Sequence, residues 1–169
     1  MKFYALIFQI GQLCVLCCAS LWAQPVESPK LPASLPVGLT DAEVQLIRKE
    51  TNPKDHVEAV TRVAEARLAQ AFKQAADNPE AALKDLELYS ALMTYGNDHT
   101  RYLNLPVKER NKILKVIEQS IFKQQRNLEG TRQQLPIEAR EQTEKLVEAI
   151  KRIRLRAIDD VLGNGGIIK

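Results

Sequence analysis

The stretch NPKDHVEAVTRVAEARLAQAFKQAADNPEAALKDLELYSALM, residues 52–93, decides the fold. Each of its two Asn-Pro pairs combines a side chain that caps a helix with a proline suited to the first helical turn. Because only Asp77 to Pro79 separate the two patterns, the sequence predicts an antiparallel helical hairpin. Apolar residues recur at spacings of three and four, which is typical of one buried helix face: Val57, Val60, Ala64, Leu68, Ala71 and Ala75, then Ala82, Leu86, Tyr89 and Met93, with Leu83, Leu88 and Leu92 beside them.

Helix signals continue upstream of this hairpin. Thr40 and Glu43 have the spacing of a capping box, in which each residue bonds the backbone of the other. They predict a short helix over about 41–50, with Val44 and Ile47 facing inward.

Two longer helices are expected downstream. Gly96-Asn97 predicts the end of the hairpin's second helix, and Leu105-Pro106-Val107 and Leu135-Pro136-Ile137 open the next two, 30 residues apart. Gly130 is expected to weaken the first of them near its end, at a cost of about 1 kcal/mol relative to alanine. The inward residues are expected to be Leu114, Ile117, Ile121 and Leu128, then Leu146 or Val147, Ile150, Ile153, Ile158 and Val161.

No stretch alternates apolar and polar residues long enough to predict a sheet. The fold class is therefore all-α, a four-helix-bundle-like array of two antiparallel hairpins preceded by a short N-terminal helix. This bundle domain is expected to cover residues 40–163, followed by a flexible tail at 164–169 that begins in a glycine-rich run.

The chain begins with the pattern of a secretory signal peptide. Lys2 precedes a largely apolar run from Phe3 to Leu21, and Ala23 is a suitable last residue before cleavage, so residues 1–23 are expected to be removed. A retained membrane anchor and lipidation at Cys17 or Cys18 are the alternatives. All three cysteines lie in this segment, so a cleaved product would contain no thiol or disulfide.

Residues 24–39 hold four prolines in sixteen positions, which predicts an extended tether between the signal and the bundle. The predicted signal holds only one basic residue, so the rest of the chain has 23 Lys and Arg against 21 Asp and Glu. This balance and the expected export, to the periplasm or outside the cell, argue against nucleic acid as a partner.

The densest basic run is Lys151, Arg152, Arg154 and Arg156. We interpret it as a solvated helix face that could also contact a partner or an anionic envelope surface, with nucleic acid the least favoured ligand.

His56, Met93 and His99 are the candidate metal or haem ligands. In an antiparallel hairpin, a residue near one helix start and residues near the other helix's end lie close together. Imidazole and thioether groups are suitable ligands for haem iron or copper. Helix ends also collect histidines for structural reasons, so we assign no cofactor to this site and expect none.

No catalytic residue is assigned. The carboxylate pairs, such as Asp85 and Glu87, are spaced as on a solvated helix face, and a catalytic acid needs a pocket that shifts its pKa. The chain also has no serine-nucleophile motif, phosphate-binding glycine loop or HExxH sequence. We therefore expect a protein that is not an enzyme.

Two family resemblances bear on the function. Residues 52–95 resemble an uncharacterised extracytoplasmic helical domain family of bacteria, through Pro53, Ala64, Glu65, Arg67, Leu68, Leu86 and Tyr89. That resemblance implies an envelope location and no known activity. LTDAEVQLIRKE, residues 39–50, is similar to the helix starts of small periplasmic stress chaperones of the Spy and CpxP kind, although Glu43 stands where they have glutamine.

The expected function is that of an envelope interaction or structural module presenting a helical face to a protein partner. A holdase-like periplasmic chaperone or envelope-stress factor is the alternative, and a metal or haem carrier comes third. If the chain forms a homodimer, it is expected to use the alanine-rich side of the helix that holds Ala64 and Ala71.

Overall fold

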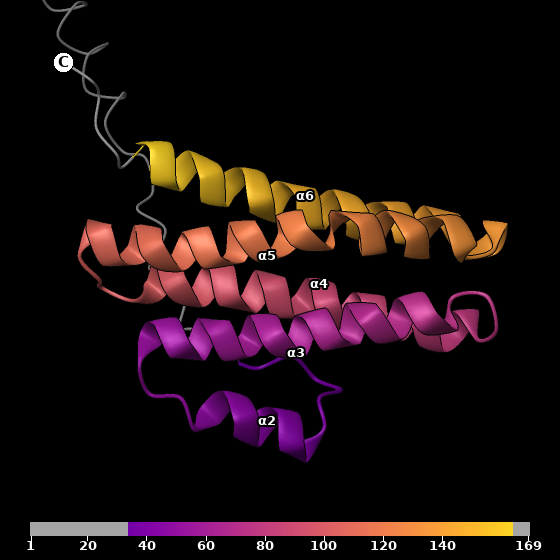
Figure 1. The fold of residues 1–169 in the computed structure, drawn as a ribbon, viewed down its shortest axis with the longest axis horizontal. Coiled ribbons are helices and arrows are strands. Elements are labelled where there is room, and N and C mark those ends of the chain that lie inside the picture. The colour runs from indigo at the N-terminus through magenta and orange to yellow at the C-terminus, as the bar shows by residue number, and fades with distance from the viewer. Residues whose placement is uncertain (1–33, 164–169) are drawn as a thin grey trace, which may run out of the picture. The chain divides into compact units, whose positions relative to one another are not determined.

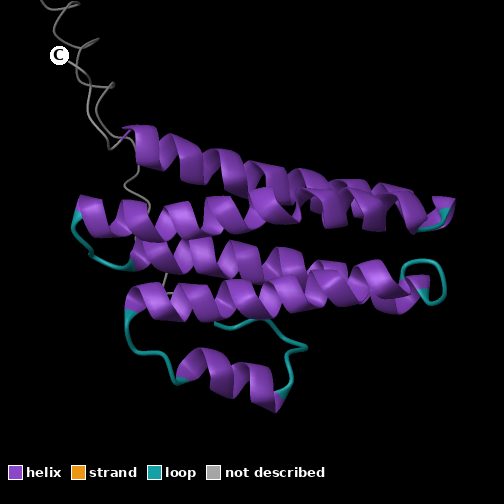
Figure 2. Cartoon of the chain, viewed as in Figure 1, coloured by secondary structure: helices purple, strands orange, loops and turns teal. Residues whose placement is uncertain are grey.

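The computed structural model describes residues 34–163, and within them the chain is all helical, with no strand. The helices are α2 (Asp41–Arg48), α3 (Pro53–Gln74), α4 (Pro79–Tyr102), α5 (Val107–Gln134) and α6 (Arg140–Gly163), with a 3₁₀ turn at Ile137–Ala139. Figures 1 and 2 show α3 to α6 as a four-helix bundle with the short α2 outside α3. The predicted fold class is thus confirmed. The predicted signal at 1–23, most of the tether and the tail at 164–169 lie outside the described residues.

Both Asn-Pro pairs open a helix as predicted. The side-chain oxygen of Asn52 accepts from the backbone N–H of Lys54 at 2.9 Å, and that of Asn78 accepts from Ala81 at 3.2 Å. The predicted inward residues of both helices are buried, apart from half-buried Leu83. α3 and α4 therefore form the expected hairpin.

The predicted end of α4 at Gly96-Asn97 is wrong. α4 continues to Tyr102, and both residues are buried inside it. A Cβ atom on Gly96 would lie 3.5 Å from Val60 Cγ1 and 3.8 Å from Ile117 Cδ1, so this position has room for a methyl group in ordinary contact but is closely surrounded by α3 and α5. Gly96 lies within α4 and has no positive φ, so it is not a left-handed helix end.

The second hairpin begins at the predicted Leu-Pro sequences. Pro106 precedes α5 directly, whereas Pro136 precedes the 3₁₀ turn before α6. α5 runs through Gly130 to Gln134, and a Cβ there would lie 2.6 Å from the Phe72 ring, so the structure places glycine at a close contact. The predicted cost of this glycine to helix stability stays a prediction. Near the end of α6, Asp160 forms an ion pair with Arg101 of α4 at 2.6 Å.

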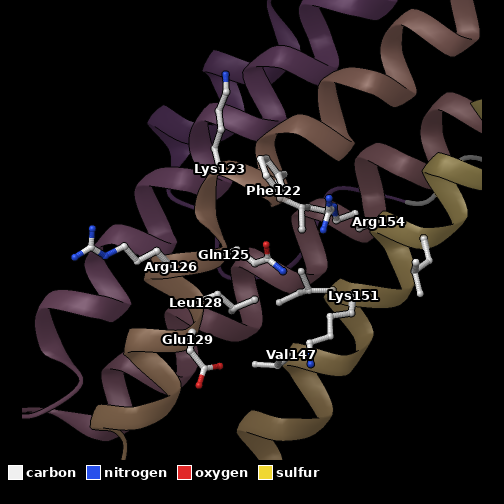
Figure 3. A pocket seen from close by; sticks show the side chains of 12 residues that line it. Phe122, Lys123, Gln125, Arg126, Leu128, Glu129, Val147, Lys151 and Arg154 are labelled. Atoms are coloured by element: carbon white, nitrogen blue, oxygen red, sulfur yellow. The ribbon is translucent and has the colours of Figure 1, made fainter.

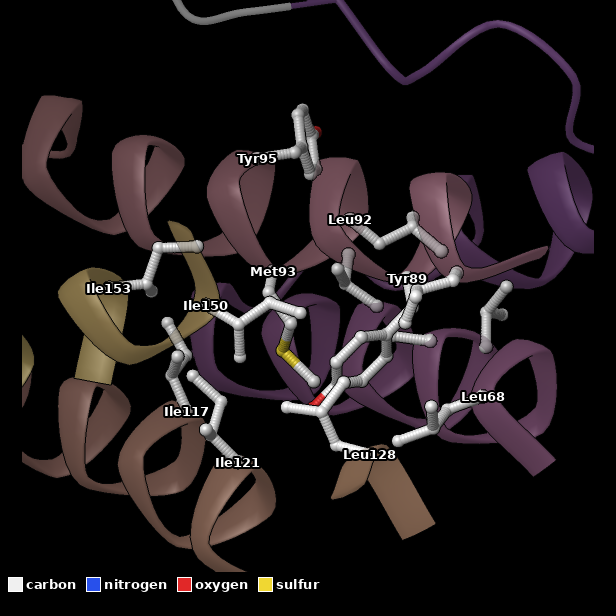
Figure 4. Close-up of a cluster of buried hydrophobic side chains, with 14 of the residues drawn as sticks. Leu68, Tyr89, Leu92, Met93, Tyr95, Ile117, Ile121, Leu128, Ile150 and Ile153 are labelled. Carbon is white, nitrogen blue, oxygen red and sulfur yellow. The ribbon is translucent and has the colours of Figure 1, made fainter. Parts of the chain in front are cut away.

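The core lies between the two hairpins (Figure 4). Tyr89 and Met93 of α4 are buried among aliphatic side chains from the other helices. In the second hairpin, Leu114, Ile117, Ile121, Leu128, Val147, Ile150 and Ile153 are buried as predicted. Ile158 and Val161 in α6 and Val44 in α2 are only half-buried.

The proposed dimer face on α3 is part of this core. Ala64 and Ala71 are 0 % exposed, and α3 packs mainly against α4 and α5. The prediction that a homodimer uses this face is therefore wrong. Small residues here serve close packing within one chain.

An ion-pair network attaches α2 to the bundle. The capping box is confirmed, since Thr40 Oγ1 accepts from the Glu43 N–H and the Glu43 carboxylate accepts from the Thr40 N–H. Arg67 of α3 donates two hydrogen bonds to Glu43, at 2.8 and 2.6 Å, and one to Asp85 of α4 at 2.8 Å. Asp85 is thus a buried partner of Arg67, which corrects the prediction of a solvated carboxylate.

The last residues of the predicted tether pack on the bundle. Leu35 and Leu39 contact the hydrophobic core, and Gly38 turns the chain with a φ of 101° beside Leu88. A positive φ is readily adopted only by glycine, so Gly38 fits this turn. Residues 34–39 therefore belong to the folded unit, which corrects the prediction of a free tether at its C-terminal end.

None of the described helices is long and apolar enough to cross a bilayer.

Candidate functional site

A groove with a volume of ≈ 710 Å³ lies between α5 and α6 (Figure 3). We call it the α5–α6 groove. Its lining comes only from these two helices: Ile121, Phe122, Lys123, Gln125, Arg126, Leu128 and Glu129 of α5, and Val147, Ile150, Lys151, Arg154 and Leu155 of α6.

The floor of the groove is apolar. Ile121, Leu128, Val147 and Ile150 form it and are buried in the bundle core. Two further apolar side chains are largely open to solvent, with Phe122 57 % and Leu155 59 % exposed. An exposed aromatic and an exposed aliphatic side chain beside an apolar floor are typical of a surface that contacts another molecule.

The margins of the groove are basic. Lys123 and Arg126 lie three residues apart on α5, and Lys151 and Arg154 are spaced likewise on α6. In Figure 3 the two α6 side chains reach towards α5, whereas that of Arg126 extends away from α6. The one carboxylate in the lining, Glu129, is paired with Arg132 at 2.5 Å. The groove therefore presents a positive field to an approaching molecule.

The exposed Phe122 ring is held in place by its neighbours. The Arg154 guanidinium lies 4.8 Å from the ring centroid, and its Nε donates to Glu118 Oε1 at 3.0 Å. A cation above an aromatic face is attracted by the ring's electron density. This arrangement limits the freedom of the ring before any contact is made, which lowers the entropy that binding would cost.

The predicted basic run divides between two surfaces. Lys151 and Arg154 line the groove, while Arg152 and Arg156 are exposed and lie outside its lining. Lys151 is also paired with Glu148 at 2.7 Å. The interpretation of the four residues as a single solvated face is therefore incomplete, because half of them belong to a partly apolar site.

The predicted candidate ligands His56 and His99 do lie together. Their ring centroids are 4.7 Å apart, and the Tyr95 ring lies 5.5 Å from that of His99. Met93 is not part of this cluster, since it is 1 % exposed in the hydrophobic core. Tyr95 completes it because residues four apart share one helix face, and Met93 does not stand four residues from His99.

The hydrogen bonds of His56 determine its neutral tautomer. Its Nδ1 lies 3.3 Å from the Glu50 carbonyl oxygen, which can only accept, so Nδ1 carries the proton. Nε2 then accepts from the Tyr95 hydroxyl at 3.0 Å. His56 thus joins the segment before α3 to α4.

This arrangement does not suit a metal. Both nitrogens of His56 are engaged by protein groups, and burial raises the pKa of the Tyr95 phenol, which disfavours the phenolate ligand. Within the described residues no three His, Cys, Asp or Glu side chains are placed to share an ion. The cluster is better described as a structural contact between α3 and α4.

The cluster predicts an acid-sensitive stability. Burial, with the charge of nearby His56, holds the pKa of His99 below its ordinary value of 6.5. The unfolded chain therefore binds the proton more readily, so stability is complete above about pH 6.5 and is lost as the pH falls through the folded pKa. His99→Gln should flatten the dependence of melting temperature on pH between 6.5 and 5.

The other groups with shifted pKa values titrate mainly outside the range from pH 6.5 to 5. The lowered carboxylate pKa values, such as that of Glu43, start from 4.5, and Tyr95 titrates above 10. Thermal unfolding of both proteins between pH 7 and 5 is the measurement. Equal slopes for the variant and the parent would exclude His99 as the responsible group.

Sequence reasoning missed the groove and Tyr95. Phe122 and Leu155 interrupt otherwise polar helix faces, which is a signal visible in the sequence. That they share one groove depends on the register between α5 and α6, which no local pattern reveals.

Comparison with protein-family models, with curated proteins and with solved structures finds no match for this chain. The two family resemblances of residues 39–95 therefore stay predictions.

Proposed function

We propose that this chain is a non-enzymatic interaction module of the bacterial envelope, which binds a protein partner in the α5–α6 groove. The observation that carries the proposal is the groove itself. It joins an apolar floor to two exposed side chains, Phe122 and Leu155, within a basic margin. The envelope location rests on the apolar run from Phe3 to Leu21 and its resemblance to a signal peptide.

A protein partner suits this site better than an enclosed small molecule. Small-molecule pockets bury most of the ligand surface. Here Phe122 and Leu155 are more than half exposed, so they offer contact area to a surface larger than the groove. Two adjacent helices with a hollow between them also accept a further helix by ordinary ridge-and-groove packing.

The groove does not suit a symmetric homodimer. A twofold axis through it would set the basic margin of one copy against the same margin of the other. Lys123 and Arg126 form no ion pair within residues 34–163 that would relieve this repulsion. The partner is therefore a different protein.

The proposal is tested by photo-cross-linking in cells that export the protein. A photoreactive phenylalanine is placed at Phe122, at Leu155, or as a control at Ile137, an exposed apolar residue away from the groove. One defined adduct from both groove positions, absent from position 137, is expected, and mass spectrometry identifies the partner.

Two results would contradict this function. No adduct from either groove position would mean that the groove is unoccupied in the cell. A broad mixture of adducts from all three positions would instead favour the holdase-like chaperone, whose clients need no single site.

A further inference from the structure

We infer that the occupant of the α5–α6 groove is an acidic amphipathic helix that contacts it over about two turns, with carboxylates along its margins. The inference rests on the proposed function and names its partner class.

The length of the groove determines the length of the helix that it can hold. The lining runs from Ile121 to Glu129 on α5 and from Val147 to Leu155 on α6, so it extends about 12 Å along each helix at 1.5 Å per residue. A partner helix covering that distance contributes about two turns, at about 5.4 Å per turn. Apolar side chains at positions i, i+3 or i+4, and i+7 would form the stripe that meets the floor.

The basic side chains of the groove determine which residues flank the apolar stripe of the partner helix. Lys123 and Arg126 have no ion pair in the described part of the chain, and they lie one helical turn apart. Carboxylates spaced by three or four residues on a partner helix match that separation. On the opposite side, Lys151 and Arg154 are already engaged by Glu148 and Glu118, so the α5 pair is expected to discriminate more strongly between partners.

Phe122 supplies the anchor. Its ring is exposed yet held by Arg154, so it offers apolar contact at low entropic cost. The apolar stripe of the partner would cover this ring and Leu155. Contact with both would explain why two large apolar side chains are kept exposed beside a charged margin.

The test uses two synthetic peptides of 14 residues and the full bundle. Both carry leucine at the stripe positions, one with glutamate and the other with lysine at the flanking positions. Fluorescence anisotropy is expected to show the acidic peptide binding at least about tenfold more tightly, because like charges across an interface repel. Its affinity should fall as salt is added.

Charge-reversed variants locate the contact. K123E/R126E is expected to weaken binding of the acidic peptide roughly tenfold and to favour the basic one. K108E/K115E makes the same charge change at exposed positions of α5 outside the groove and should have little effect. F122A tests the anchor and should weaken both peptides. Unchanged helical circular dichroism of each variant excludes unfolding as the cause.

Three results would overturn the inference. Both peptides could bind equally, or K108E/K115E could match K123E/R126E. Vesicles containing phosphatidylglycerol could also bind with the same dependence on Lys123 and Arg126, which would identify an anionic lipid surface as the ligand. A defined cross-linked partner together with any of these results would leave the proposed function standing and remove only the acidic helix.

Discussion

Replacing Arg67 by alanine is expected to lower the free energy of unfolding by about 3 kcal/mol. Arg67 is the only described residue bonded to both Glu43 of α2 and Asp85 of α4. Its side chain is 20 % exposed and that of Asp85 is 10 % exposed. Removing the guanidinium leaves a largely buried carboxylate without its counter-charge, and that desolvation is expensive.

The Arg67 prediction is checked by urea unfolding. A shift of the midpoint at constant slope reports a change in stability alone. Arg132→Ala is the matched control, because Arg132 pairs with Glu129 three residues away on the exposed surface and should contribute little. Arg67→Lys should recover only part of the loss, since lysine cannot form the two-bonded fork with Glu43. If both alanine variants lose the same small amount, the network is not a stabilising contact.

The second large effect is expected at Gly96, where the size of the introduced side chain determines whether the protein becomes more or less stable. Gly96→Ala places a methyl group 3.5 Å from Val60 Cγ1, which is ordinary contact, and improves helix propensity. We expect it to stabilise the protein by about 0.5–1 kcal/mol. Gly96→Leu must fit three more carbons among Val57, Val60 and Ile117, all 0 % exposed, and should cost about 3 kcal/mol.

The pair of Gly96 variants separates packing from helix propensity. Leucine and alanine are both good helix formers, so propensity alone would stabilise both proteins. Thermal and urea unfolding of the two variants is the measurement. A leucine variant as stable as the parent would show that α3, α4 and α5 can separate at this point without loss.

The helices could be predicted because their signals are local. The Asn52 and Asn78 caps, the Thr40–Glu43 capping box and the stripe along α3 each depend on residues within one or two turns. Such patterns determine where a helix begins and which face it buries. The order of two hairpins followed from the short connections between the helices.

The features that sequence reasoning missed depend on distant residues. Gly96 looks like a helix end until Val60 and Ile117 are placed against it, and Asp85 looks solvated until Arg67 reaches it from α3. The same holds for Leu35 and Leu39, whose proline-rich setting suggests a free tether although they meet the core. Local periodicity contains no information about these partners.

In the candidate site too, the features that depend on local signals could be predicted and those that depend on distant residues could not. The proximity of His56 and His99 followed from hairpin geometry, and the structure brings them together. That Tyr95 rather than Met93 lies beside the two histidines depends on how α4 is rotated about its own axis. A placement based only on distance from the helix ends does not take this rotation into account. The groove depended on the register of α5 against α6, so the basic run was noticed while its apolar floor was not.

The position of α2 has a consequence for reach. α2 and the segment from Leu35 to Leu39 pack on the first hairpin, whereas the α5–α6 groove belongs to the second, and Figure 1 shows α2 and α6 at opposite sides of the bundle. Helix layers stack at about 8–10 Å, so the two sides are about 20 Å apart. The width of the bundle therefore separates the groove from the segment at which the described chain begins. A molecule held in the groove would therefore stand off from Leu35 by about the thickness of the bundle.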